Sequence, residues 1–303
     1  MRWKVYTALV MVQVFFGIHY FVTKILLESM APRAWAAIRI IGAAAILMAW
    51  NLLVVRGRQP PWRHFGKLAV FAVFGVILNQ ILFVEGLSRT TPSHSSIINS
   101  LIPVLTLSFA LALRRETWTR RRLLSILLSF SSVLVLLRVD DLQFSEPWVV
   151  GDLLTLANAT SFSFFLVISK RYLERNDALV TTAWMLCLGA VGITLVGSGP
   201  LQQVDLASLG GSFWLLAGYA IVFATALTYL MNSFALQRVE ASTVALFIYL
   251  QAPIATFLSV TFLGEALTPR FLLAASGIFI GVFFAVSGSR PAVPSTDSNG
   301  TLA

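Results

Sequence analysis

Apolar stretches of about 20 residues recur along the whole sequence, and this feature restricts what the chain can fold into more than any other. A stretch of that length crosses the hydrocarbon core of a bilayer as an α-helix. Only 12% of the residues are charged and 57% are hydrophobic, whereas soluble domains carry about 25% charged residues. A soluble fold has too little polar surface to cover so much apolar sequence. The sequence therefore predicts an all-α polytopic membrane protein.

Proline, glycine and charged residues interrupt the apolar sequence and divide it into ten predicted transmembrane helices, here called spans. The spans cover residues 5–27, 34–55, 67–87, 94–113, 121–138, 150–171, 179–197, 211–236, 243–263 and 269–288. The first run is longer than the h-region of a signal peptide and no small-residue cleavage site follows it, so we interpret it as a span. The polar residues 289–303 predict a disordered cytoplasmic tail.

The distribution of lysine and arginine predicts the orientation of the chain in the membrane. If the N-terminus is cytoplasmic, the segments on that side hold sixteen of these residues and the opposite loops hold four. Cytoplasmic loops carry such an excess of positive charge. Because the basic residues lie in short loops, the net charge of +9 indicates the lipid bilayer and not nucleic acid as a partner. We predict a multi-pass protein of the cell (inner) membrane with both termini cytoplasmic.

The two halves of the sequence share a frame of landmark residues. Pairs that lie 149 positions apart are Phe74 and Phe223, Leu87 and Leu236, Arg89 and Arg238, and Glu116 and Glu265; Lys24 and Lys170 lie 146 apart. This frame predicts a first repeat over residues 5–138 and a second over 150–288. Since each repeat holds five spans, an odd number, the two are inverted relative to the membrane. Inverted repeats are common in secondary transporters, whose substrate site lies near the midplane between the repeats.

Pro103 and Pro253 occupy matching places in the fourth and ninth spans. Proline in a helix interior costs about 3 kcal/mol because it removes a donor and clashes with the preceding turn. The carbonyls that lose their partner, those of Asn99 and Tyr249, must then be satisfied by protein or by a water-filled cavity. We predict that both prolines are hinges beside a shared cavity.

Polar and aromatic side chains at mid-depth of the predicted spans are the candidates for binding a substrate. Ionisable and amide groups in hydrocarbon normally face a bundle interior or a wet cavity. The candidates are His19, Asn79, Gln80, Phe83, Asn99, Tyr229, Asn232, Tyr249 and Gln251. The alternative for each is a hydrogen bond between helices, worth about 0.6 kcal/mol on average. Lys24 and Arg39 are expected to pair with Glu28 or to extend toward the interface.

Several of these residues together resemble a known family of transporters. They are Gly17, Lys24, Arg39, Pro103 with Glu116, Ala241-Ser242, Pro253, Gly264-Glu265, Gly277 and Gly281. The pattern resembles the drug/metabolite transporter superfamily, and in particular its ten-helix EamA-type exporters. The resemblance implies a substrate cavity formed mainly by spans 3, 4, 8 and 9, with parts of spans 1 and 6. It also implies export of small organic metabolites, with amino acids, including aromatic ones, as the leading class.

Signals for other functional classes are weak. The sequence has no nucleotide-binding loop or hydrolase motif, and its histidines are not at metal-ligand spacing. We therefore predict no enzyme activity and no cofactor. Two alternatives stay open, a channel and a lipid-handling membrane protein or enzyme. Small residues in spans 5 and 10, namely Ser125, Ser129, Ser132, Gly277 and Gly281, suit close helix packing and leave a monomer or weak dimer as the expected state.

Overall fold

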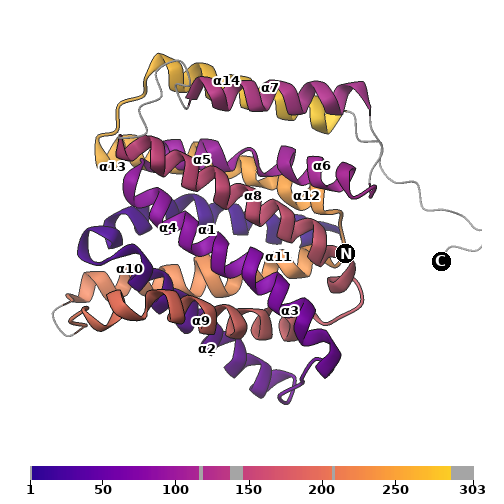
Figure 1. Cartoon of the computed structure of the whole chain (residues 1–303), viewed down its shortest axis with the longest axis vertical. Coiled ribbons are helices and arrows are strands. Elements are labelled where there is room, and N and C mark those ends of the chain that lie inside the picture. The colour runs from indigo at the N-terminus through magenta and orange to yellow at the C-terminus, as the bar shows by residue number, and fades with distance from the viewer. Residues whose placement is uncertain (1, 116–118, 137–145, 207–208, 288–303) are drawn as a thin grey trace, which may run out of the picture.

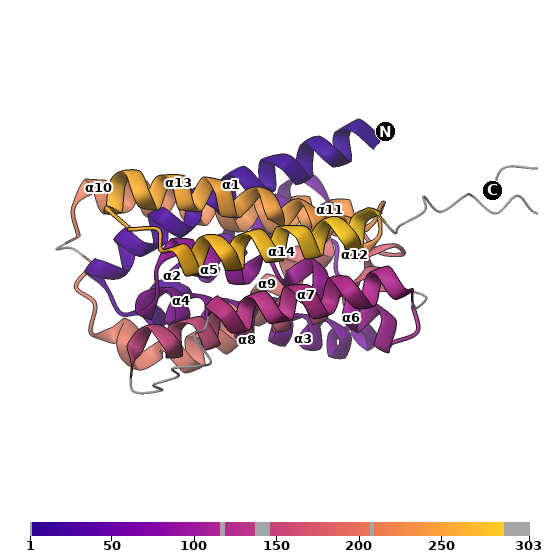
Figure 2. The same ribbon diagram turned by 90° about the horizontal axis from the view of Figure 1, so that it is seen from above.

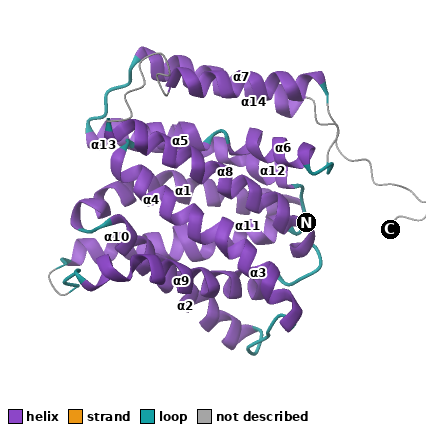
Figure 3. Ribbon diagram, viewed as in Figure 1, coloured by secondary structure: helices purple, strands orange, loops and turns teal. Residues whose placement is uncertain are grey.

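The computed structural model describes residues 2–115, 119–136, 146–206 and 209–287. Every regular element in this part of the chain is helical (Figure 3). Six helices run without interruption: α1 (Arg2–Ser29), α2 (Pro32–Val54), α7 (Arg120–Leu136), α8 (Pro147–Leu173), α9 (Ala178–Gln202) and α14 (Pro269–Ser287). The other helices come in consecutive pairs: α3 (Phe65–Ala72) with α4 (Asn79–Arg89), α5 (Pro92–Asn99) with α6 (Ile102–Ala112), α10 (Gly211–Ile221) with α11 (Thr228–Leu236), and α12 (Ala241–Leu246) with α13 (Gln251–Leu263).

Eight helical segments of the described chain are long and apolar enough to cross a membrane. They are Trp3–Ser29, Pro32–Val54, Trp62–Arg89, Pro92–Ala112, Pro147–Leu173, Ala178–Gln202, Gly211–Leu236 and Ala241–Leu263. These segments coincide with predicted spans 1 to 4 and 6 to 9. Two shorter apolar helices, Leu127–Leu136 and Pro269–Gly281, fall within predicted spans 5 and 10. The all-helical, multi-pass architecture is confirmed, and the total of ten spans stays a prediction.

The helices form one bundle whose members run roughly along a common direction (Figures 1 and 2). We call the end where α1 begins the proximal end, and the end where α1 finishes and α5 and α8 begin the distal end. In both figures the proximal end is on the right. At one edge of the bundle α7 lies beside α14, and α2 packs on α9 at the opposite edge. The remaining helices fill the space between these two pairs.

The central helices pack across the two halves of the sequence. The first long helix of one half, α1, packs against α11 and α13 of the other half. In the same way α8 packs against α4 and α6. Glycine makes one of these approaches possible, because a Cβ on Gly75 would lie 2.6 Å from the ring of Phe165 in α8. The core of the molecule is therefore an interface between the two halves.

A π-helical turn, Val73–Leu78, joins α3 to α4 near the middle of the bundle. Such turns disturb the regular hydrogen bonding of the helix and are frequent at functional sites. Side chains of neighbouring helices satisfy its carbonyls. Ser161 of α8 donates to the carbonyl of Phe74 at 2.8 Å, and Tyr229 of α11 donates to that of Gly75 at 2.6 Å. The turn is thus held by both central helices that flank it.

A second π-helical turn, Val222–Leu227, joins α10 to α11 at the position 149 residues further along the chain. Carbonyls within this turn and just before it are satisfied by nearby threonines. Thr225 donates to the carbonyl of Ala220 at 2.7 Å, and Thr228 to that of Phe223 at 2.8 Å. The offset between the two turns equals the offset between the landmark residues of the sequence.

Both predicted hinge prolines lie in the first turn of a helix and not in a helix interior. A turn at residues 100–101 separates α5 from α6, and Pro103 is the second residue of α6. A 3₁₀ segment, Phe247–Leu250, separates α12 from α13, and Pro253 is the third residue of α13. A first turn accepts proline because its N–H groups lack intrahelical partners. The breaks lie where the sequence predicts bends; hinge motion itself stays a prediction.

Small residues bring α7 and α14 close together. A Cβ on Gly277 would lie 2.1 Å from the hydroxyl of Ser132, and the side chains of Ser129 and Ser132 are buried. The small-residue spacing of these two helices thus serves packing within the chain. Ser125 belongs to the same series, but its side chain lies outside the described part, and the oligomeric state stays a prediction.

Candidate functional site

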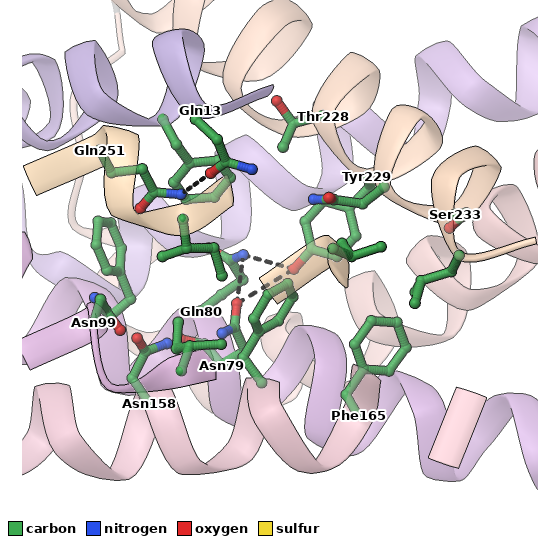
Figure 4. A pocket seen from close by; sticks show the side chains of 18 of the residues that line it. Gln13, Asn79, Gln80, Asn99, Asn158, Phe165, Thr228, Tyr229, Ser233 and Gln251 are labelled. Atoms are coloured by element: carbon green, nitrogen blue, oxygen red, sulfur yellow. Dashed lines mark hydrogen bonds between the residues drawn. The ribbon is translucent and has the colours of Figure 1, made fainter. Parts of the chain in front are cut away.

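A cavity lies at mid-depth between the two halves of the bundle (Figure 4). Its wall combines amide, hydroxyl and aromatic groups from α1, α4, α5, α8, α11 and α13. The polar lining residues are Gln13, Tyr20, Asn79, Gln80, Asn99, Asn158, Thr228, Tyr229, Asn232, Ser233 and Gln251. Apart from these, Phe16, Phe83, Phe162 and Phe165 supply the aromatic surface. A cavity of this composition can bind a solute that has both polar and apolar parts.

The structure brings together seven of the nine predicted substrate-binding residues. Those that line the cavity are Asn79, Gln80, Phe83, Asn99, Tyr229, Asn232 and Gln251. His19 and Tyr249 do not belong to the lining. Substrate binding by any of the nine is still a prediction, because the cavity shows where a solute fits and not which solute enters.

One hydrogen-bonded chain in the cavity wall connects α1, α5 and α13. Gln251 donates to the side-chain oxygen of Gln13 at 2.5 Å and accepts from the hydroxyl of Tyr20 at 3.3 Å. Asn99 donates to that same hydroxyl at 2.9 Å. The amide oxygen of Asn99 is buried without a hydrogen-bond partner in the described structure. The chain therefore ends in a free acceptor at the cavity.

A second hydrogen-bonded group connects α4, α8 and α11 (Figure 4). Gln80 donates to the hydroxyl of Tyr229 at 2.7 Å and to the side-chain oxygen of Asn79 at 3.0 Å. Asn158 donates to the backbone carbonyl of Asn79 at 2.6 Å. These contacts fix the side chains that follow the first π-helical turn, so the irregular backbone and the polar wall form one unit.

The cavity is contracted in this conformation. The space inside it that admits water-sized molecules is about 50 Å³, whereas pockets for small molecules generally hold roughly 300–1,000 Å³. Several ordered waters fit that space, because each needs only about 10–15 Å³ by this measure. An organic solute requires the surrounding side chains or helices to move apart.

His19 lies behind the cavity wall and is fully buried. Its ring stacks on that of Phe83 with centroids 5.8 Å apart. The ring nitrogen Nε2 contacts the Nη1 group of Arg39. Because a guanidinium has only donors, Nε2 must accept, and the neutral ring then carries its proton on Nδ1, 3.2 Å from the hydroxyl of Thr23. A protonated His19 would place two positive charges in contact.

Tyr249 points away from the cavity. Its ring packs on Phe279 of α14 with centroids 6.0 Å apart, and its hydroxyl has no partner in the described structure. Within a 3₁₀ segment successive side chains turn by a third of a circle instead of 100°. Tyr249, four residues before Pro253, therefore faces α14 and not the cavity that regular α-helical spacing predicts.

A network of polar contacts lies at the distal end of the bundle, outside the cavity lining. Asp152, at the start of α8, is completely buried and accepts hydrogen bonds from Thr90 at 2.5 Å and from Nδ1 of His94 at 2.9 Å. Lys24 donates to the carbonyls of Leu87 and Thr90 at 2.9 and 2.7 Å. These contacts join α1, α4, α5 and α8 at one end of the bundle.

Two further carboxylates belong to the distal end. Glu85 pairs with Arg33 at 2.8 Å and with Arg89 at 2.5 Å. Glu265 follows Gly264, whose positive φ of 67° ends α13, and contacts the hydroxyls of Thr91 and Ser259. A carboxylate is favourable beside the first turn of α5 because the helix N-terminus carries partial positive charge. Glu116, its predicted counterpart, lies outside the described residues.

Among the described residues, the proximal end has fewer charged contacts across the bundle than the distal end. Lys170 donates to the carbonyl of Leu236 at 2.8 Å, as Lys24 does to that of Leu87. The beginning of α1 meets the 3₁₀ segment through the stacked rings of Tyr6 and Phe247, with centroids 5.9 Å apart. The two ends thus share the lysine contact and differ in the groups that close them.

The list of candidates drawn from the sequence missed five polar residues of the wall: Gln13, Tyr20, Asn158, Thr228 and Ser233. Asn158 is predictable from the sequence, because it is an amide in the middle of an apolar span, as Asn79 is. Gln13 and Tyr20 are seven residues apart and therefore share one face of α1. Which face of α1 meets the cavity depends on packing that one sequence does not reveal.

The described residues contain no group of three or more histidine, cysteine, aspartate or glutamate side chains that could hold a metal ion. Cys187, the single cysteine of the sequence, is half-buried in α9 away from the cavity. The chemistry that the site offers is hydrogen bonding and aromatic contact.

Comparison with known families gives a match over nearly the whole chain. The sequence profile described as the EamA-like transporter family matches residues 3–138 and 149–287. These two matched segments correspond to the two predicted repeats, with the boundary near the loop between α7 and α8.

Similar proteins carry transporter names. The uncharacterized transporter YyaM of Bacillus subtilis (strain 168) is 23% identical over 93% of this chain and 93% of that protein. The uncharacterized inner membrane transporter YedA of Escherichia coli (strain K12) is 24% identical over 95% of this chain and 92% of that protein. A protein of known crystal structure superposes with a TM-score of 0.66 over 93% of this chain and 95% of its own, at 19% identity, which shows a shared fold.

Proposed function

The chain belongs to the EamA-like transporter family, so it is a membrane transporter and not an enzyme, and from this premise we propose that it is a secondary transporter that exports small organic metabolites by alternating access. The observation that carries the proposal is the central cavity, whose polar side chains come from both halves of the sequence. Amide and hydroxyl groups supply donors and acceptors at a depth where lipid supplies none. A solute bound there lies between two packed bodies that can rock against each other.

We propose ten spans in two inverted five-helix repeats, over residues 5–138 and 150–288. Two observations support the duplication: the π-helical turns recur at an offset of 149 residues, and Lys24 and Lys170 make equivalent contacts. The direction of the helices supports the inversion, because α1 runs from the proximal to the distal end and α8 runs the opposite way (Figure 2).

In the proposed transport cycle the distal and proximal ends of the cavity open and close alternately. In the conformation described here the distal end is held by Asp152 and Lys24, and the cavity is too small for a metabolite. Movement of the proximal parts of the helices enlarges the cavity and admits the solute. Pro103 and Pro253 are the proposed hinges, since the helix is already interrupted beside each of them.

We propose amino acids, including aromatic ones, as the leading substrate class. The family resemblance suggests this class, and the wall suits it because amide groups bind polar ends while phenylalanine rings contact an apolar side chain. The seven predicted residues that line the cavity are the proposed contacts. His19 and Tyr249 lie outside the wall in this conformation, so we do not assign them a direct contact.

We propose that both termini face the cytoplasm in a cell inner membrane. The excess of lysine and arginine in the proximal loops supports this orientation. The relative from Escherichia coli is named an inner membrane transporter, which supports the location. Cysteine labelling of the two ends in intact cells with an impermeant reagent tests the orientation; distal residues are expected to react and proximal ones are not.

The proposal is tested by transport into proteoliposomes of a labelled amino-acid panel, with and without a pH gradient. Saturable uptake and counterflow of at least one member are expected from a carrier. Conduction without saturation would identify a channel instead. Movement of no member would contradict the amino-acid proposal.

The site is tested by removing amides from its wall. Asn79→Ala and Gln251→Ala are expected to lower transport at least roughly tenfold, because each breaks a connected group of buried hydrogen bonds. Gln203→Ala is the matched control, since Gln203 is an exposed amide after α9. Folded yield and elution profile in detergent must match those of the wild type. Unchanged transport in both cavity variants would show that the cavity is not the substrate site.

A further inference from the structure

Arg39 of α2 places a positive charge deep inside the bundle. Arg39 is 1% exposed and is the eighth residue of a 23-residue helix that is long and apolar enough to cross a membrane. A guanidinium stays protonated in proteins and must be paired or hydrogen-bonded when buried. In the described part of the chain Arg39 forms no ion pair with a carboxylate. Glu28, its expected partner, does not fill that role.

The contacts of Arg39 leave one edge of the guanidinium free. The Nη1 group meets the ring nitrogen of His19, while Nε and Nη2 are buried without a hydrogen-bond partner among the described residues. Nε and Nη2 are neighbours on the same side of the planar group. A carboxylate binds such an edge through two parallel N–H···O bonds. The free edge is therefore the part of the side chain that recognises anions best.

A single aromatic ring links this edge to the cavity. The guanidinium carbon lies 5.7 Å from the centroid of Phe83, and Phe83 is part of the cavity lining. The same ring contacts Tyr20 and His19 with centroid separations of 5.4 and 5.8 Å. Phe83 therefore contacts both the buried charge and the space in which a solute would bind.

We propose that the Nε and Nη2 groups of Arg39 form the anion-binding end of the cavity, uncovered when Phe83 turns aside, and that the substrate carries a carboxylate. This inference rests on the proposed function and specifies the substrate class of that same site. His19 serves as the positioning residue, because its lone pair on Nε2 holds the guanidinium so that the other edge stays free.

The cavity also offers a partner for the opposite end of such a substrate. The amide oxygen of Asn99 is buried and unpartnered, and it ends the hydrogen-bonded chain through Tyr20. One free donor edge and one free acceptor match a solute with a carboxylate and an ammonium group. The inference thus favours zwitterionic amino acids over cationic drugs, which Arg39 would repel.

The experiment compares each labelled amino acid with its carboxamide in the proteoliposome assay. The carboxamide keeps the side chain and the amine and lacks the negative charge. Wild-type protein is expected to carry the acid with an apparent affinity at least roughly 30-fold higher, as for other buried charge pairs that lose one partner. Equal transport of acid and carboxamide would overturn the inference and leave the proposed function intact.

Variants at position 39 test whether Arg39 causes the preference for the acid over the carboxamide. Arg39→Gln is expected to abolish the preference for the acid, and Arg39→Lys to keep a weaker one, since an ammonium is a point charge without the planar fork. Arg58→Gln is the matched control because Arg58 is exposed in the loop after α2. An unchanged preference in Arg39→Gln would contradict the inference. If Arg39→Gln does not fold, the inference is tested by the preference for the acid in the wild type and by its weakening in Arg39→Lys.

A second measurement keeps the inference testable if no amino acid is carried. The unfolding temperature of the purified wild type is measured in increasing acetate and benzoate against chloride at constant ionic strength. A saturable rise that is absent in Arg39→Gln is expected. No rise in the wild type would overturn the anion site, whereas failure of the transport panel by itself would overturn only the amino-acid proposal.

Discussion

At the distal end of the bundle the start of α8 is held by the carboxylate of Asp152, which binds Thr90 and His94. At the proximal end the start of α1 is held by the ring of Tyr6, which stacks on Phe247. Asp152 and Tyr6 lie 146 positions apart, the offset that also relates Lys170 to Lys24. Matching places in the two halves therefore use a buried charge in one case and an exposed aromatic contact in the other.

A second pair of matching places shows the same difference. Arg89 pairs with Glu85 four residues earlier, at 2.5 Å. Arg238 lies 149 positions further on and covers the ring of Phe234, four residues earlier, at 3.8 Å from its centroid. The arginine is kept in both halves, while its partner is a carboxylate at the distal end and an aromatic ring at the proximal end.

The comparison teaches how two similar halves produce an asymmetric molecule. Hydrogen bonds to buried charged groups contribute about 1.5–3 kcal/mol each, whereas an aromatic pair contributes about 0.5–1.5 kcal/mol beyond burial. Because the two halves share their landmark residues, each end of the bundle has contacts that hold it closed. The side chains at each end determine which set of contacts is stronger. We expect the proximal end to open at a lower cost than the distal end.

Replacement of the buried carboxylate should have the largest effect. Asp152→Ala removes the acceptor shared by Thr90 and His94, and we expect it to lower the free energy of unfolding by about 3 kcal/mol. It should also open the distal end. Labelling of Asn232→Cys in a Cys187→Ala background by an impermeant maleimide measures this opening. Faster labelling from the distal face is expected, and unchanged labelling would show that Asp152 does not hold the distal closure.

The two lysines test the part of the frame that both ends share. Lys24→Met removes hydrogen bonds to carbonyls at the end of α4. Lys170→Met removes one to the carbonyl of Leu236 and an ion pair with Glu174. Each should cost about 2 kcal/mol of unfolding free energy. Thermal unfolding in the same detergent compares them. Effects that differ by more than about 1 kcal/mol would contradict the equivalence of the two contacts.

The outer ion pairs of the distal end should matter less. Glu85→Gln removes contacts to Arg33 and Arg89, whose side chains are 50% and 39% exposed, so water and salt screen the charges. We expect a loss of about 1 kcal/mol or less that shrinks further at high salt. Unfolding temperatures at two ionic strengths measure it, with Glu240→Gln at the proximal end as control. A loss as large as that of Asp152→Ala would contradict this ranking.

The aromatic contact of the proximal end should give the smallest loss of stability. Tyr6 is 37% exposed, and Tyr6→Ala is expected to cost about 0.5–1 kcal/mol. Because this end is the weaker closure, the same variant should speed labelling of Asn232→Cys from the proximal face. Slower labelling from that face would reverse the comparison between the ends.

Much of the fold is predictable from the sequence because the bilayer limits the choice. Apolar length locates the spans, and an amide inside such a span indicates an interior position, which is why Asn79, Gln80 and Gln251 were predicted in the cavity. Tyr249 was placed by its spacing from Pro253. The 3₁₀ segment changes the direction of that side chain, and no residue type in the segment announces it.

The sequence by itself determined the membrane-spanning class, the positions of most helices and the paired landmarks of the two halves, because these depend on hydrophobic length and on recurring residue types. The tertiary structure decided which side chains meet. Asn99 reaches Tyr20, Arg39 finds His19 in place of a carboxylate, and Asp152 meets His94 across residues far apart in the chain. Such contacts depend on the rotation and depth of packed helices, which local sequence leaves open because every apolar face in a bilayer is equally soluble.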